Sequence, residues 1–217
     1  MKGLLIKDFY LLKQVKKSML VFVLIAVFML FANKGDSSFI ISYTTVMMAM
    51  LGISTIGYDE HNDGMTFLMT LPVTRKIYVY EKYLYCVGMC ALGCIIAMII
   101  TLAGALIWNR SITITDMAIL SLVSFLIGIF MLIPMLPVQL KFGSEKGRIG
   151  ILVVFFTLFA AGYAVVRVLQ MIKVDIISVL NQVVSHSYSW VIAVVVIMFL
   201  YFISIRISMH IMEKKQY

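Results

Sequence analysis

Three cysteines are the closest-spaced group of reactive side chains in the sequence. Cys86, Cys90 and Cys94 recur every four residues, which places their sulfur atoms on one face of a helix. Thiols in that arrangement could bind a soft metal, whereas small side chains in that arrangement let two helices approach closely in lipid. Gly93 and Ala97 lie on or beside the same stripe, so we expect close helix packing and no metal site.

The remaining candidates for catalysis are scattered. His61, His186 and His210 stand in three separate segments, and metal ligands have to converge on one point. The long apolar runs contain no Asp, Glu, Lys or Arg, which leaves a proton relay without candidates. We therefore predict no catalytic residue in this chain and no enzyme activity of its own.

One stretch imitates the end of a nucleotide-binding strand, because apolar residues 53–58 lead into Asp59 and Glu60. The phosphate loop that accompanies such a strand, Gly-x-x-x-x-Gly-Lys-Ser/Thr, is absent from the sequence. The nearest glycine-rich stretch, residues 143–148, lacks its spacing and its hydroxyl. Hydrolysis of ATP is thus predicted to need a second protein.

The elements that position these residues are apolar helices. Of the 217 residues, 63% are hydrophobic and 13% are charged, against about 45–50% and about 25% in soluble domains. Continuous apolar runs in lipid must be helical, because backbone groups there have no water to bond. The sequence therefore predicts an all-α polytopic membrane protein, with residues 1–217 as a single transmembrane domain. The six predicted spans are residues 18–33, 37–58, 83–109, 117–140, 149–166 and 187–205.

The basic residues orient these spans. With the N-terminus in the cytosol, fourteen Lys and Arg residues lie inside and four lie outside. This distribution satisfies the positive-inside rule, and the opposite orientation violates it. Both termini are therefore predicted to be cytosolic. The basic excess reflects topology, and we expect no nucleic acid partner.

Two segments are predicted to lie along the membrane surface. Residues 1–17 form an amphipathic interfacial helix, in which Leu4, Leu11 and Val15 share one arc and lysines crowd the other. Asp8 falls within the apolar arc, which is an unusual place for an acid in a helix that touches only lipid. On the outer side, residues 167–186 are predicted to form a re-entrant or interfacial segment.

The loop between the second and third spans carries acids right at the membrane exit. Asp59, Glu60 and Asp63 precede a Leu71-Pro72 break. We interpret this loop as a short helix opened by acids at its N-terminus, which ends near Gly64 or runs on to the proline. A solvated linker is the alternative.

The order of several motifs resembles the permease subunits of type-two ABC exporters. These motifs are the acidic pair after the second span, Gly64, Leu71-Pro72-Val73-Thr74-Arg75, and Pro134-x-x-Pro137 followed by Lys141-Phe142-Gly143. The opening residues 2–10 are similar to the entrance helix of that family. The small size, without a large outer domain, resembles bacterial peptide exporters and immunity pumps, such as phenol-soluble modulin exporters.

The resemblance implies a half-transporter in the bacterial cytoplasmic membrane. A second permease copy, identical or paralogous, would face this one, and separate ABC ATPase subunits would bind ATP and Mg²⁺, with no cofactor on this chain. Residues 59–75 would hold a coupling helix between the second and third spans. The implied ATPase-coupling residues are Asp59, Glu60, His61, Asp63, Gly64, Met65, Thr66, Leu71, Pro72 and Arg75.

In that family the second and fifth helices line the translocation path. The implied path residues are Ser42, Tyr43, Thr45, Ser54, Thr55, Thr157 and Tyr163. Hydrogen bonding between helices is the simpler role for any one of them. Spans without charge fit an amphipathic or hydrophobic cargo, a peptide before a lipid or a hydrophobic drug.

Two other classes of protein stay open at this point. A partner-free secondary carrier or channel would be expected to show intramembrane ion sites, and the spans contain no charged residue. A membrane scaffold or sensor would not need a structured loop between the second and third spans.

Overall fold

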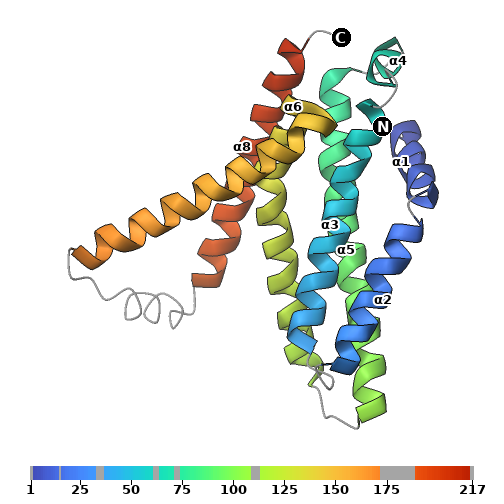
Figure 1. Ribbon diagram of the computed structural model, residues 1–217, viewed down its shortest axis with the longest axis vertical. Coiled ribbons are helices and arrows are strands. Elements are labelled where there is room, and N and C mark those ends of the chain that lie inside the picture. Colours follow the sequence, from blue (N-terminus) through green and yellow to red (C-terminus); the bar gives the residue numbers. More distant parts are fainter. Residues whose placement is uncertain are drawn as a thin grey trace.

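A computed structural model describes most of the chain. It covers residues 2–14, 16–32, 37–60, 64–70, 74–108, 113–171 and 189–215, and everything below refers to them. Figure 1 shows an all-helical molecule in which α2, α3, α5 and the first part of α6 run side by side. The helices are α1 (Lys2–Gln14), α2 (Lys16–Ala32), α3 (Ser37–Glu60), α4 (Gly64–Thr70), α5 (Arg75–Trp108), α6 (Ile114–Met171) and α8 (Ser189–Lys214).

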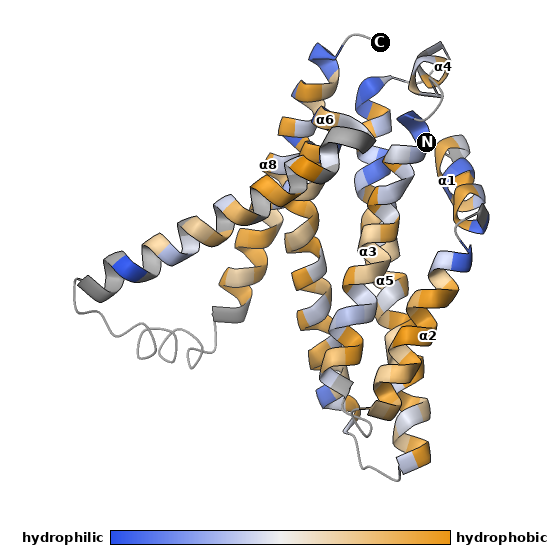
Figure 2. Ribbon diagram, in the orientation of Figure 1, coloured by the Kyte–Doolittle hydropathy of each residue, from blue (hydrophilic) through white to orange (hydrophobic). Residues whose placement is uncertain are grey.

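Four of these helices are long and apolar enough to cross a membrane: residues 38–60, 75–108, 114–143 and 191–214. A fifth crossing is present if the bent pair α1 and α2 counts as one broken span. Figure 2 shows the apolar colouring along these helices and hydrophilic residues gathered near α1, α4 and the C-terminus. The chain is therefore a multi-pass membrane protein, and the predicted number of six spans stays a prediction.

Both chain ends lie at the end of the bundle that carries α4 (Figure 1). We call this the α4 end. The cytosolic placement of both termini stays a prediction, which rests on the distribution of lysine and arginine. The predicted outer segment, residues 167–186, lies outside the described residues beyond Met171.

Small side chains bring α5 close to its neighbours. A Cβ atom on Gly93 would lie 2.9 Å from the Cα of Thr45 in α3, and one on Gly52 would lie 3.3 Å from the Sγ of Cys86. The Sγ of Cys90 lies 3.1 Å from the Cβ position of Gly128 in α6. The close helix packing predicted from the cysteine spacing is therefore confirmed.

Hydroxyl groups tie α5 to α8 and α6. The hydroxyl of Tyr83 lies 2.6 Å from the Oγ of Ser204 and 2.8 Å from the Oγ of Ser208, both on α8. Tyr201 donates to the backbone oxygen of Tyr83, and Ser204 donates to that of Ile133 in α6. Such bonds hold helices together in lipid, where apolar burial alone does not favour one helix over a lipid tail.

Gly143 breaks α6 into two helical stretches. Its φ of 75° and ψ of −173° are not helical, and only glycine adopts this backbone region without strain. The stretch before Gly143 packs in the bundle, and the stretch after it runs away from the bundle (Figure 1). The residues between the predicted spans 117–140 and 149–166 therefore continue as helix on both sides of Gly143.

We expect Gly93→Ala to destabilise the packed helices, because its methyl group would meet backbone atoms of α3 that have no rotamer to move. Overpacking of this kind costs about 1–3 kcal/mol. The measurement is thermal unfolding in detergent, followed with a thiol-reactive dye, since Cys86, Cys90 and Cys94 are all buried in the folded chain.

Gly88→Ala is the matched control, because a Cβ on Gly88 meets nothing within 4 Å. Alanine there gains about 1 kcal/mol of helix propensity. Equal midpoints for the two variants would contradict the packing argument.

Candidate functional site

The first helix packs against the bundle through a face that includes an acid. Leu4, Asp8 and Leu12 follow each other at four-residue spacing on α1, and all three are buried. Asp8 itself has no exposed surface. Asp8, which the sequence placed in an apolar arc, therefore faces protein and not lipid. Its surroundings are provided by α3 and α5.

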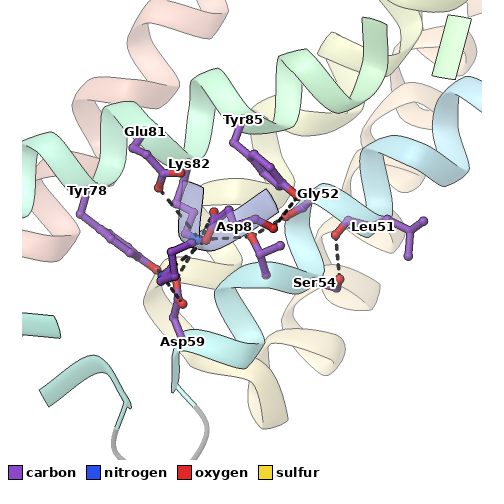
Figure 3. A network of polar contacts seen from close by, with 11 residues as sticks. Asp8, Leu51, Gly52, Ser54, Asp59, Tyr78, Glu81, Lys82 and Tyr85 are labelled. Atoms are coloured by element: carbon purple, nitrogen blue, oxygen red, sulfur yellow. Dashed lines mark hydrogen bonds and ion pairs between the residues drawn. The ribbon is translucent and has the colours of Figure 1, made fainter. Parts of the chain in front are cut away.

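Lys82 on α5 is the partner of Asp8, and it is completely buried. Its ammonium group forms an ion pair with Asp8, lies 2.8 Å from Asp59 and donates to the Oγ1 of Thr55 at 3.2 Å. Figure 3 shows Lys82 between the carboxylates of Asp8 and Asp59. A lysine ammonium has three donors, so all three are used.

Asp59, in the last turn of α3, gathers donors from two other helices. Its carboxylate pairs with Lys7 of α1 and Lys82 of α5, and accepts a hydrogen bond from the hydroxyl of Tyr78 at 3.0 Å. A carboxylate at the C-terminal end of a helix is unfavourable beside the negative end of the helix dipole. The two lysines offset that cost.

A third carboxylate, Glu81, is buried beside this network. Its Oε2 lies 4.0 Å from the Nζ of Lys82, and neither of its oxygens accepts a hydrogen bond within the described residues. Three carboxylates thus face two ammonium groups. We call Lys7, Asp8, Asp59, Glu81 and Lys82 the charge cluster.

A short helix, α4, follows α3 in the predicted loop, but Asp59 and Glu60 do not open it. Asp59 and Glu60 end α3, and the first turn of α4 contains no acid. The interpretation that Asp59 and Glu60 open this short helix was therefore wrong, because α3 continues through residue 60. His61, Asp63, Leu71 and Pro72 lie outside the described residues.

One side of α4 is packed and the other is open. Met65 and Leu68 are buried in the core shared with α5 and α6, whereas Phe67 is 67% exposed and Thr66 is also exposed. Gly64 is needed where α4 begins, because a Cβ there would lie 2.7 Å from the backbone oxygen of Asp59. Phe67 was missed by the sequence argument, which looked for charged and turn-forming residues.

Thr74 and Arg75 end the Leu71-Pro72-Val73-Thr74-Arg75 motif, and both make hydrogen bonds to helices of the same chain. The hydroxyl of Thr74 accepts a hydrogen bond from the backbone N–H of Ile77 at 3.3 Å, which is the usual role of an N-cap. The guanidinium of Arg75 donates to the backbone oxygens of Met212 and Glu213 on α8.

The predicted path residues fall into two separate groups. Within the bundle, the Oγ of Ser42 lies 3.1 Å from that of Ser124, Thr45 contacts Cys94, and Thr55 binds Lys82. Ser54 donates to the backbone oxygen of Leu51. These contacts are the helix-to-helix and local hydrogen bonds that the simpler interpretation expected.

The other path residues do not join that group. Tyr43 stacks on Phe39 at the far end of α3. Thr157 and Tyr163 are exposed on the part of α6 that leaves the bundle, where Tyr163 accepts a hydrogen bond from Arg167. The described residues of one chain therefore do not assemble the seven candidates into one path.

Comparison with protein families identifies the family of this chain. The model of the ABC-2 family transporter proteins matches residues 3–213, from the start of α1 to the last turn of α8. The chain belongs to the ABC-2 transporter family. Searches of curated proteins and of solved structures find no significant match.

Membership gives the chain a coarse role. ABC-2 proteins are the membrane-spanning component of ABC transporters, and membership implies an ATPase partner. The α4 end is where this ABC-2 chain gathers its buried charges and its exposed short helix (Figure 1).

Removing Lys82 should destabilise the protein more than removing an exposed lysine. Lys82→Met leaves Asp8 and Asp59 buried without their shared partner, and breaking a buried pair from one side costs about 3–5 kcal/mol. Lys76→Met is the control, since Lys76 and its partner Glu213 are exposed, and such pairs contribute about 0–1 kcal/mol.

A triple variant separates charge from packing. Lys82→Met combined with Asp8→Asn and Asp59→Asn removes the uncompensated carboxylates, so we expect it to recover much of the lost unfolding midpoint. If the triple variant unfolded as early as Lys82→Met, the charge cluster would not be the cause of the loss.

Proposed function

We propose that this ABC-2 protein is the permease subunit of an ATP-driven exporter in the bacterial cytoplasmic membrane. Its cargo is an amphipathic or hydrophobic molecule, with a peptide such as a toxin or antimicrobial peptide as the first choice. A separate ABC ATPase binds ATP and Mg²⁺, and a second permease copy completes the transporter.

The observation that carries the proposal is the two-sided packing of α4. Met65 and Leu68 anchor α4 in the core, whereas the side chain of Phe67 is exposed on the other side of α4. An exposed aromatic side chain next to a buried anchor is typical of a residue that fills a pocket in a partner. We assign that pocket to the ATPase subunit.

The charge cluster supplies the rigidity that such a contact requires. It joins the end of α3, which leads into α4, to α1 and to α5. A force on α4 then moves α3 and α5 together. ATP binding can shift the permease between two conformations only if the ATPase has different affinities for them.

The uncharged spans support an amphipathic cargo. Residues 83–109 and 117–140 contain no Asp, Glu, Lys or Arg, and the charge cluster lies near α4, where its ion pairs are internal to the chain. A partner-free ion carrier would need ionisable groups near mid-membrane.

Phe67→Ala should weaken binding of the ATPase while leaving the fold unchanged, because Phe67 is exposed and contributes little to the core. Loss of a central aromatic residue typically costs about 2 kcal/mol or more at an interface, which corresponds to at least a tenfold weaker complex. The measurement is the amount of phosphate-loop ATPase that co-purifies with the tagged permease from bacterial membranes.

Phe130→Ala is the matched control, since Phe130 is 46% exposed on α6, away from α4. Equal recovery of ATPase with both variants would remove Phe67 from the interface. Transport of solute by the purified chain in vesicles without any ATPase would overturn the proposed function as a whole.

A further inference from the structure

The C-terminal end of α8 is held by residues from two other parts of the chain. The Nη1 of Arg75 donates to the backbone oxygens of Glu213 at 2.7 Å and Met212 at 3.2 Å. The last carbonyls of a helix have no partner within the helix. Arg75 therefore caps α8 from the first residue of α5.

Beyond that cap, Lys215 turns back toward the bundle. Its ammonium group donates to the Oε1 of Glu60 at 3.0 Å and to the backbone oxygen of Leu140 at 3.1 Å. Glu60 ends α3, and Leu140 lies one turn before the break in α6. The side chains of Lys215 and Glu60 are only 26% and 14% exposed, so solvent screens this pair less than a surface pair.

Glu60 also lies directly against the break in α6. A Cβ atom on Gly143 would lie 2.6 Å from the Oε2 of Glu60. The carboxylate therefore occupies the space that any other side chain at position 143 would need. Gly143 meets two requirements at once, a positive φ and room for Glu60.

We propose that Lys215 is a positioning residue that couples the break in α6 to the end of α3. Arg75 and Lys215, with Glu60 and the carbonyls of Leu140, Met212 and Glu213, form what we call the C-terminal clasp. The clasp adds side-chain contacts to the backbone connection at Gly143. When α4 moves, the second stretch of α6 then moves together with α3 and α5.

The transmission part of this inference rests on the proposed function, whereas the clasp itself does not. Without the contact from Lys215, the second stretch of α6 would follow α3 through the backbone at Gly143 and the close approach of Gly147 to Gln139 in the first stretch. The charge cluster joins α1 to α3 and α5, whereas Lys215 of the clasp joins the end of α8 to α3 and α6.

Hydrogen exchange on the purified full-length chain tests the clasp. In Lys215→Met, backbone amides around Gly143 and in the last turn of α3 should exchange about tenfold faster or more, as expected for the loss of a charged hydrogen bond. Lys214→Met removes the same charge from an exposed neighbour and should leave these amides unchanged. Lys215→Arg should restore slow exchange, since a guanidinium can also reach a carboxylate and a carbonyl.

Nucleotide tests the transmission. In the complex with its co-purifying ATPase, ATP with orthovanadate should change exchange in α3, α5 and the second stretch of α6 of the native protein. In Lys215→Met the change should persist in α3 and α5 and disappear from α6. A clasp with a merely structural role would leave the response of α6 intact.

Each of the other possible results contradicts one part of the proposal. Equal exchange in Lys215→Met and Lys214→Met without nucleotide would overturn the clasp. Faster exchange with an unchanged response of α6 to nucleotide would overturn the transmission. If no ATPase co-purifies with the native protein, the proposed function and the transmission both fail, and the measurement without nucleotide still decides the clasp.

Discussion

The buried ammonium group of Lys82 is the interaction on which the α4 end depends. It binds Asp8, Asp59 and Thr55 and so fills its three donor positions with groups from two other helices. A lone charge in this apolar surrounding would be very costly. The three helices must therefore assemble together, and α1 has to leave the lipid surface and dock against α3 and α5.

The same constraint supports the proposed transmission of force through α4. The end of α3 is pinned on one side by Lys7 and Lys82 through Asp59, and on the other side by Lys215 through Glu60. Adjacent acids thus face different helices, which α-helical geometry requires of neighbouring positions. Asp59 and Glu60, which the resemblance assigned to an ATPase contact, pair with lysines of the same chain. The exposed side of α4 carries Thr66, Phe67 and Thr70, and Phe67 is the largest of these side chains.

Two kinds of contact hold the helices together: buried ion pairs at the α4 end, and close packing of small residues along the rest of the bundle. Gly52, Gly93 and Gly128 let α5 approach α3 and α6 closely, which gives van der Waals contact where lipid offers no hydrophobic driving force. That packing is compatible with sliding or tilting of helices. The ion pairs at the α4 end resist such movement, since each displacement would separate opposite charges in a low dielectric.

The sequence by itself determined the helical membrane architecture, the family resemblance and the close packing of the cysteine stripe. These follow from long apolar runs and from residue spacing, which act locally along one helix. The pairing of Asp8 with Lys82, of Glu60 with Lys215 and of Arg75 with the end of α8 was decided only by the tertiary structure. These partners are 74, 155 and 138 residues apart, and no local periodicity relates them. Asp8 was a signal in the sequence, because an acid within an apolar arc indicates a buried partner but does not identify that partner.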